Sequence, residues 1–354
     1  MDFASKVFKS DYEVADLKKI SVEAPEKIEK INLDIYFQFD DYIKLKRRSV
    51  SPKMINVYKN LKDTIKTFEI FRRKPITFDC IGYNFYEEFV DHMRFEHIHR
   101  RKKQVIKGFK TSTIGKQIKQ LRQFLKNRIA KKIIAPINLE EFTSMDEGSD
   151  AIYLTNDEII KIHDLDLIQH PYLEKYWDLL VVACLTGLRF SDFSVIKPED
   201  IRGKTLYKKQ KKSEHWVVIP LRDRADYILN YRFKKKIPLV NDVDFNRYIK
   251  VIGKLAGVDE VIKFSHKRAN KKVEISKPKF AWITSHTCRR SFCTNEFLAG
   301  TPVELIMKIS GHKSLRDFYR YIRITPEEAA QKIREIWQQR GEIAAATIKA
   351  VSVA

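Results

Sequence analysis

The sequence predicts a mainly α-helical protein of two domains with one small antiparallel sheet. Three observations predict this fold class. Apolar residues recur at helical spacing over most of the chain, this periodicity is lost between residues 136 and 153, and two short strand-like segments flank one basic turn. The chain has 354 residues, of which 44% are hydrophobic, so two domains can each bury a core.

The charge balance indicates a polyanionic partner. Lys and Arg total 68 against 46 Asp and Glu, a formal net charge of +22. Such a surplus favours nucleic acid, whose phosphates would supply much of the binding energy. A cationic enzyme with an unrelated substrate is the alternative that charge alone leaves open.

The cysteines and the hydropathy of the chain indicate the cellular compartment of the protein. The four cysteines do not form a paired framework, which indicates a reducing, cytoplasmic location. The N-terminus lacks the apolar core of a signal peptide. The longest apolar run, Leu179 to Leu185, is too short to span a bilayer. The cysteines are Cys80, Cys184, Cys288 and Cys293.

The first part of the chain is expected to hold a flexible lead-in, residues 1–30, and a helical domain, residues 31–135. A short strand is expected at Lys19 to Val22 in the lead-in. The clearest helix is Thr113 to Ile133, with Ile114, Ile118, Leu121, Leu125 and Ile129 on one side. The basic residues fall mainly on the other faces, which suits a helix lying on DNA, although an ordinary solvated face is equally compatible. They are Lys116, Lys119, Arg122, Lys126 and Arg128, of which the first four are the DNA-contact candidates.

A linker is expected at residues 136–153, which turn acidic and contain Pro136 and Gly148. The capping-box pattern Thr155 to Glu158 then opens the second domain, residues 154–340. A buried helix from Trp177 to Leu185 is expected to end at Gly187. Two strands follow, Thr205 to Gln210 and His215 to Leu221, joined by a turn at Lys211 to Glu214.

The rest of the second domain is expected to be helical after Lys279, with helix ends at Gly300 and Gly311 and a last helix from Pro326. The polar, basic segment Lys263 to Lys279 is not expected to be regular throughout. Gly341 is expected to break the last helix and leave residues 341–354 as a tail. That tail either docks on a neighbouring protomer or frays.

Four separated pieces of the second domain carry candidate chemistry. Arg189 follows a helix-ending glycine, and the basic turn Gln210 to Glu214 joins the two strands. His286 and Arg289 are three residues apart and share a helix face. His312 follows a glycine, and Tyr321 comes nine residues later. Each piece alone is weak evidence, and their joint order within one domain is informative.

This order resembles the tyrosine recombinase family, the phage and transposon integrases with an Arg…Lys…His-x-x-Arg…His…Tyr array. The resemblance covers about Tyr153 to Trp337, and Ser112 to Leu125 looks like part of the family's helical core-binding domain. It implies a mixed α+β catalytic domain and a site-specific DNA recombinase, similar to the integrases of bacterial mobile elements. It also implies double-stranded DNA as partner, a homotetramer on paired sites, accessory DNA-bending proteins, and neither cofactor nor metal.

Carried over residue by residue, the resemblance gives six catalytic positions. Arg189 and Arg289 would hold the non-bridging phosphate oxygens, and a guanidinium suits that task because it presents a planar fork of donors. A tyrosine hydroxyl in general has a pKa of about 10, so a nucleophilic tyrosine needs a base or a positive field. The implied roles are Tyr321 as nucleophile, His286 as base, Lys212 as acid for the 5′-oxygen, and His312 as phosphate hydrogen-bonder.

Several local alternatives stay open. Lys211 and, more distantly, Lys209 compete with Lys212, and alignment on the following Ile-Pro favours Lys212. Tyr319 competes with Tyr321, and the two are expected on different faces of one helix. Cys288 and Cys293 beside His286 suggest zinc only weakly, since the spacing fits no common site and buried thiols fit better. Asp192 is interpreted as an orienting residue, and Arg290 departs from the family, which often has histidine there.

Two other functions compete with recombination. A type IB topoisomerase-like enzyme would relax DNA by the same chemistry, and a basic DNA-binding protein would keep the scaffold without catalysis. The complete set of six residues argues against the second. The DNA site and the choice among integration, excision and inversion cannot be read from the sequence, nor whether an N-terminal arm-binding domain is lacking or trimmed.

Overall fold

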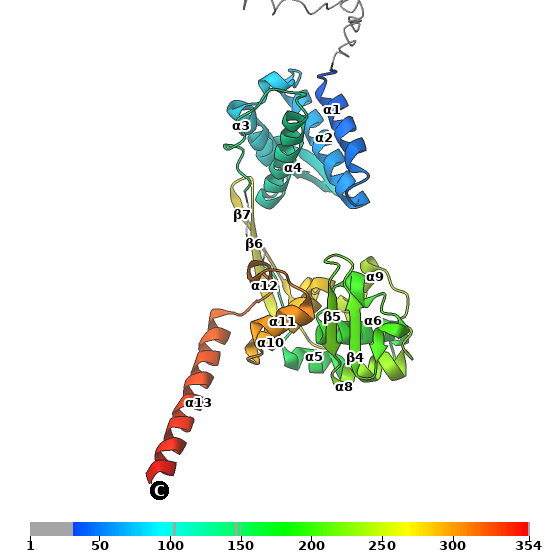
Figure 1. The fold of residues 1–354 in the computed structure, drawn as a ribbon, viewed down its shortest axis with the longest axis vertical. Helices are drawn as coiled ribbons and strands as arrows, with labels where there is room; N and C mark the ends of the chain where they lie inside the picture. The colour runs from blue at the N-terminus through cyan, green and yellow to red at the C-terminus, as the bar shows by residue number, and fades with distance from the viewer. Residues whose placement is uncertain (1–30, 102–103, 146–147, 149, 353–354) are drawn as a thin grey trace, which may run out of the picture. The chain divides into compact units, whose positions relative to one another are not determined.

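The computed structural model describes residues 31–101, 104–145, 148 and 150–352. It separates into two compact units. Unit 1 comprises Met1–Glu147 with Lys267–Lys271, and unit 2 comprises Gly148–His266 with Lys272–Ala354. The architecture is mainly helical with small antiparallel sheets, as the sequence predicted (Figure 1). No helix within the described ranges is long and apolar enough to cross a membrane.

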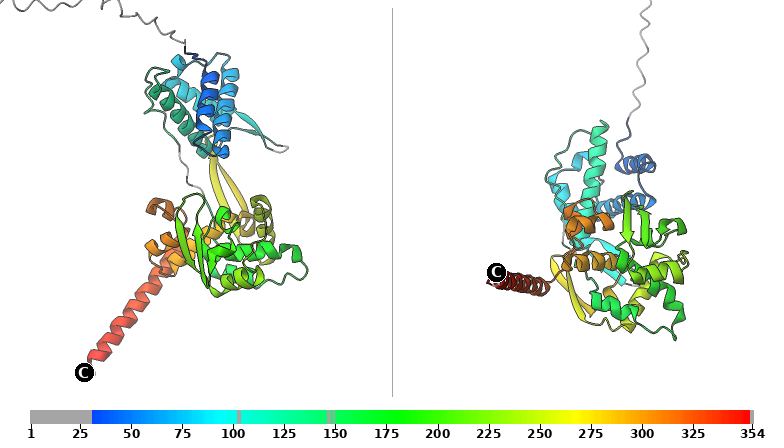
Figure 2. Two further views of the ribbon diagram at one scale, coloured as in Figure 1. Left: turned by 45° about the vertical axis from the view of Figure 1, so that its right-hand side comes forward. Right: turned by 60° about the horizontal axis from the view of Figure 1, so that its bottom comes forward.

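The helices of unit 1 gather into one bundle, drawn from blue to teal in Figures 1 and 2. Its centre is aromatic: the rings of Phe39 and Phe124 stack with centroids 3.8 Å apart, and Phe68 packs edge-on to Phe85. The expected apolar face of the fourth helix is confirmed, because Ile114, Ile118, Leu121 and Leu125 are all buried. The elements are α1 (Ile35–Lys46), α2 (Pro52–Arg72), η2 (Phe78–Cys80), α3 (Tyr83–Asp91), η3 (His92–Glu96), β1 (Ile98–Arg101), β2 (Gln104–Lys107) and α4 (Thr111–Ala130).

Unit 1 corrects two expectations and leaves one outside the described residues. The region is not helical throughout, because β1 and β2 pair as an antiparallel hairpin whose second strand contains the β-branched Val105 and Ile106. Arg128 does not lie on a cationic face: its side chain is fully buried and pairs with Asp41 at 2.7 Å. Arg128 is seven residues after the buried Leu121, and seven residues return to the same helix face. The expected strand at Lys19 to Val22 lies outside the described residues.

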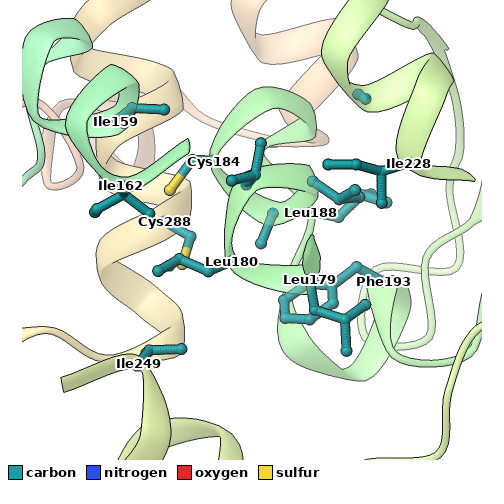
Figure 3. Packing of buried hydrophobic residues seen from close by; sticks show 14 of the residues in the cluster. Ile159, Ile162, Leu179, Leu180, Cys184, Leu188, Phe193, Ile228, Ile249 and Cys288 are labelled. Carbon is teal, nitrogen blue, oxygen red and sulfur yellow. The ribbon is translucent and has the colours of Figure 1, made fainter. Parts of the chain in front are cut away.

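Unit 2 is built around α6 (Glu174–Thr186), which packs against α10 (Ser285–Leu298). Figure 3 shows Cys184 of α6 and Cys288 of α10 among Leu180 and Ile162 in this core. All four cysteines of the chain are free thiols. The predicted capping box is confirmed: Thr155 and Glu158 cap α5 (Asn156–His163) reciprocally.

The predicted pair of strands joined by a turn is confirmed as the hairpin β4–β5, which is part of a three-stranded antiparallel sheet, β3–β4–β5. Tyr207 pairs with Val218 in the register of β4 and β5. Pairing with β3 was not predicted, because two residues are too few to show alternation. Several of the remaining elements of unit 2 position the side chains of the candidate site. They are β3 (Ile201–Arg202), β4 (Thr205–Lys209), β5 (Trp216–Pro220), η4 (Pro171–Leu173), α7 (Phe190–Phe193), η5 (Pro198–Asp200), α8 (Asp223–Asp226), η6 (Tyr227–Arg232), α9 (Asp242–Leu255), η7 (Lys279–Trp282), α11 (Val303–Ser310), α12 (Leu315–Tyr319) and α13 (Pro326–Ser352).

Two expectations for the second domain are wrong. The segment Lys263 to Lys279 is largely regular, because β6 (Val261–Arg268) and β7 (Lys271–Pro278) form a hairpin in which Glu274 pairs with Lys263 and Lys272. Opposite charges on neighbouring strands stabilise a hairpin that composition alone made look irregular. Gly341 does not end the last helix, since α13 continues to Ser352. A glycine within a helix costs only about 1 kcal/mol relative to alanine, and the good helix formers around it offset this cost.

Candidate active site

Arg189 is placed by the turn that ends α6. Gly187 takes the left-handed conformation there with φ of 66°, and a Cβ at this position would lie 2.4 Å from the Phe292 ring. Both constraints favour glycine. The chain then extends at Arg189, whose Nη1 donates to Oε1 of Gln210 at 2.7 Å. The guanidinium is therefore held by a neutral amide.

Lys212 lies in the turn between β4 and β5. The turn is closed by the backbone N–H of Glu214, which donates to the Gln210 carbonyl, and Glu214 itself has a φ of 58°. The buried Asp192 carboxylate accepts the backbone N–H of Lys211 at 2.9 Å. Asp192 thus ties the turn to α7, while Lys212 is exposed at its tip.

Arg289 is a fully buried cation on α10, one turn after His286. Its Nη1 donates to the Gly187 carbonyl at 2.9 Å, and its Nη2 donates to Nε2 of His312 at 3.0 Å. It makes no ion pair with a carboxylate in the described part of the chain. Burial, and then the nearby charge of Arg189, lower the pKa of Arg289 to about 10.

His312 follows α11, which ends at Gly311 with φ of 72°. An arginine can only donate, so Nε2 of His312 accepts from Arg289 and the ring proton sits on Nδ1. Nδ1 donates to Oγ of Ser310 at 2.8 Å, and that hydroxyl donates to the Ile306 carbonyl. Burial, followed by the charges of Arg289 and Arg189, lowers the pKa of His312 to about 3, so the ring is neutral.

Tyr321 lies beyond the end of α12, so the expectation that Tyr319 and Tyr321 share one helix is wrong. The short helix ends at Tyr319 because Arg320 caps it and the N–H of Tyr321 turns back to the Phe318 carbonyl. The Tyr321 ring lies 4.7 Å from the His312 ring, and the Arg289 guanidinium is 5.3 Å from its centroid. Tyr319 is 51% exposed and packs near Phe297.

His286 is exposed at the rim of the same cavity as these groups. Partial desolvation first, and then the positive charges of Arg290 and Arg289, lower the pKa of His286. A neutral histidine accepts a proton, which is the form that a general base requires.

One cavity of about 830 Å³ brings all six sequence-derived candidates together. Lys209, Lys211 and Tyr319 do not line it. Sequence reasoning missed several polar lining residues, which had no pattern of their own and are found only by proximity. The candidates are Arg189, Lys212, His286, Arg289, His312 and Tyr321, and the missed polar residues are Ser191, Ser213, Asp242, Ser285, Lys313, Asp317 and Arg320.

Cys288 and Cys293 do not lie in a metal site. Cys288 belongs to the main core of unit 2, and Cys293 packs with Phe292 and Phe318. Within the described residues, no group of three His, Cys, Asp or Glu side chains could hold a metal ion. Both thiols are fully buried, which matches the alternative that treated them as core residues.

The basic candidates on α4 face outward from the unit 1 core. Lys116, Lys119 and Lys126 are exposed, and Arg122 is half-buried. No ion pair within the described residues holds any of the four. They are available to a polyanion as a strip along one side of the helix.

One open cavity thus gathers a tyrosine hydroxyl, two guanidiniums, a lysine and two histidines. Two family models match the chain: the phage integrase family over residues 153–328, and the phage integrase SAM-like domain over residues 34–143. The chain belongs to the phage integrase family and is a site-specific DNA recombinase. This assignment does not favour the topoisomerase or the non-catalytic alternative.

Solved structures share the fold. A lambda integrase dimer bound to a COC′ core site is 17% identical, with a TM-score of 0.59, and the match covers 82% of this chain and 77% of that one. The Tn1549 transposon integrase, bound to a circular intermediate DNA, is 16% identical, with a TM-score of 0.60 and coverage of 86% and 100%. A lambda integrase tetramer bound to a Holliday junction is 16% identical, with a TM-score of 0.59 and coverage of 85% of both chains. No curated protein sequence matches the chain.

Proposed function

We propose that Tyr321 attacks a DNA phosphate and that five of the residues lining the cavity drive this step. They are Arg189, Lys212, His286, Arg289 and His312. The observation that carries the proposal is the position of the Tyr321 ring, against both His312 and Arg289 at the wall of one open cavity. Attack forms a bond between the tyrosine oxygen and phosphorus and breaks the bond to the 5′-oxygen. The product is a 3′-phosphotyrosyl DNA and a 5′-hydroxyl, and the reverse step rejoins a strand.

Arg189 and Arg289 are assigned to the non-bridging oxygens. Arg289 is buried without a carboxylate partner in the described residues, and Arg189 is held by a neutral amide, so neither charge is cancelled. Charge that grows on phosphate oxygens during attack would meet donors already in place. Such prearranged donors usually contribute more to catalysis than any other single effect.

His286 and Lys212 are assigned to the two proton transfers. His286 takes the proton of the Tyr321 hydroxyl, and its lowered pKa keeps it in the accepting form near neutral pH. Lys212 gives a proton to the leaving 5′-oxygen from the tip of a turn that lines the cavity. General acid help of this kind contributes roughly 10²–10⁴-fold.

His312 is assigned to orienting Arg289 and contacting the phosphate. Its Nε2 accepts from Arg289, so donation to a phosphate oxygen needs a proton on Nε2. The negative charge of a bound phosphate would favour that protonation. His312 would then donate to the phosphate in place of accepting from Arg289.

Unit 1 is proposed as the core DNA-binding domain, with 136–153 as linker and 154–340 as catalytic domain. The exposed Lys116, Lys119 and Lys126 and the half-buried Arg122 of α4 would contact the phosphates of double-stranded DNA. The net charge of +22 supports that partner. Action on genomic DNA places the protein inside the cell, and a cytoplasmic location remains part of this proposal.

We further propose a homotetramer on paired DNA sites, with accessory DNA-bending proteins as possible additional partners. The fold shared with a tetrameric lambda integrase complex supports an assembly of this kind. Ile333 and Trp337, one turn apart on α13, are both exposed and are available to a neighbouring protomer. The C-terminal tail, residues 341–354, is a separate candidate for docking on a neighbouring protomer. A truncation after Gln339 that left tetramers on DNA intact would refute docking by this tail.

The test is a covalent adduct. Purified protein is incubated with fragmented genomic DNA from the strain that carries the gene, and the reaction is stopped with denaturant. Protein-linked DNA is recovered, its ends are sequenced, and the linked peptide is identified by mass spectrometry. We expect phosphate on Tyr321 and a defined DNA site, which is then made as a nicked duplex that traps the adduct.

Tyr321→Phe is expected to abolish the adduct, since it removes the attacking oxygen and keeps the ring. Tyr319→Phe is the matched control and is expected to react like the wild type. Loss of the adduct in the Tyr319 variant with retention in the Tyr321 variant would overturn the assignment. Relaxation of a supercoiled plasmid without the mapped site would favour a topoisomerase instead.

A further inference from the structure

Gln210 is a fully buried glutamine at the base of the turn that carries Lys212. Its side-chain amide has three partners. Oε1 accepts from Nη1 of Arg189 at 2.7 Å and from Oγ of Ser213 at 2.8 Å, and Nε2 donates to the Ser310 carbonyl at 2.9 Å. Both ends of the amide are therefore used.

The three partners lie on three separate segments of the cavity wall. Arg189 follows α6, Ser213 neighbours Lys212 in the turn, and Ser310 ends α11 two residues before His312. The Ser310 hydroxyl oxygen also accepts a hydrogen bond from Nδ1 of His312. One amide thus links a guanidinium, the lysine-bearing turn and the histidine-bearing helix end.

The backbone of Gln210 fixes the turn as well. Its N–H donates to the His215 carbonyl, and its carbonyl accepts the N–H of Glu214, both at 2.8 Å. The end of α11 packs closely against the Gln210 side chain. A Cβ on Gly311 would lie 2.4 Å from Oε1 and 2.6 Å from Nε2 of Gln210, so the helix end approaches the amide as closely as glycine allows.

The partners also dictate the amide's orientation and its neutrality. The Arg189 guanidinium can only donate, so it requires the oxygen, and the Ser310 carbonyl can only accept, so it requires the nitrogen. A carboxylate here would repel the Ser310 carbonyl and would cancel the charge of Arg189. A neutral amide holds the arginine and leaves its charge for another anion.

We propose that Gln210 is a positioning residue, which sets the placement of Arg189, Lys212 and His312 relative to one another for the phosphate. It touches none of the reacting atoms and acts through these three residues. The proposal rests on the function proposed above. It predicts that altering the amide slows strand cleavage more than it weakens DNA binding.

The test uses the full-length protein and the nicked duplex to which the wild-type adduct maps. Gln210→Leu removes all three hydrogen bonds, and Gln210→Glu keeps the shape and replaces the donor. First-order adduct formation is measured at saturating protein, and the dissociation constant is measured separately. We expect Gln210→Leu to cleave about 10²-fold more slowly, since small misplacements cost that much, with a less than threefold change in affinity.

Gln210→Glu supplies a readout that a purely structural role would not move. The positive charge of Arg189 is one of those that lower the pKa of His286, and a new negative charge beside Arg189 would partly offset it. The pKa of His286 would rise, so the acid limb of the pH–rate profile would shift to higher pH. Gln210→Leu leaves the charge unchanged and should keep the wild-type limb. This contrast holds even if one variant is less stable.

Gln38→Leu is the matched control. Gln38 is likewise buried, accepts from an arginine (Arg128) and donates to a backbone carbonyl, but it lies in unit 1. Its loss should lower stability without changing the cleavage rate of bound DNA. Wild-type rates in both Gln210 variants, or a slow Gln210→Leu beside a Gln210→Glu with wild-type rate and pH profile, would overturn the inference. An inactive wild type would instead count against the proposed function.

Discussion

Replacing Arg289 with methionine should abolish cleavage and leave the fold as stable as before, or more stable. Arg289 is fully buried, and its partners are a carbonyl and a neutral imidazole. Its pKa falls to about 10 in the folded protein. A cation with a lower pKa in the folded than in the unfolded state destabilises the fold at every pH below about 10.

The magnitude follows from that shift. About 2.5 pH units at 1.36 kcal/mol each give a penalty of about 3 kcal/mol for the charged side chain. The variant loses two hydrogen bonds, worth about 1 kcal/mol each. Methionine fills a similar volume with a flexible side chain, so the net change is about 1 kcal/mol of added stability.

Arg128→Met is the matched control, because Arg128 is equally buried and has a carboxylate partner, Asp41, at 2.7 Å. Breaking this pair should cost about 2 kcal/mol, which is less than for a fully buried pair because Asp41 is partly exposed. Amide hydrogen exchange in α10 and in α4 measures the opening free energy of each unit separately. A loss of about 2 kcal/mol or more in Arg289→Met would refute the reasoning.

Three further outcomes test other parts of the structure. The Gly187→Ala variant should unfold at a lower urea concentration than the wild type and should cleave DNA more slowly. The left-handed φ and the Phe292 ring leave no room for a methyl group at this position. A wild-type unfolding midpoint in urea would contradict this reasoning. Burial, and then the charge of His97, lower the pKa of His92 to about 4. As pH falls below 6.5, the His92 side chain takes up a proton in the unfolded chain before it does so in the folded one. The free energy of unfolding should therefore fall by about 2 kcal/mol between pH 7 and pH 5. His92→Phe should remove that drop in urea titrations at pH 7 and pH 5, and an unchanged drop would exclude His92 as its source. Cleavage of the mapped duplex should proceed equally in EDTA, because arginines supply the positive charge, and a rate restored by Mg²⁺ would contradict the proposed chemistry.

The sequence by itself determined the features that depend on near neighbours in the chain. The capping box at Thr155, the helix ends at Gly187 and Gly311, and the turn between β4 and β5 were all predicted. Each arises from backbone geometry or hydrogen bonds within about five residues, so local residue types suffice. The order and spacing of the six candidate residues could also be recognised from the sequence, because a family motif is defined by residue types and their order along the chain.

Only the tertiary structure decided which polar groups meet across distant segments. Arg128 can be buried on the core face of α4 because Asp41 lies opposite it and pairs with its charge. Tyr321 lies beyond α12, against Arg289 and His312. Gln210 begins the basic turn that the sequence predicts, but its contacts with residues 21 and 100 positions away exist only in the folded chain. Charge, burial and hydrogen-bond partners are properties of a place in the fold, and residues far apart in the chain create that place.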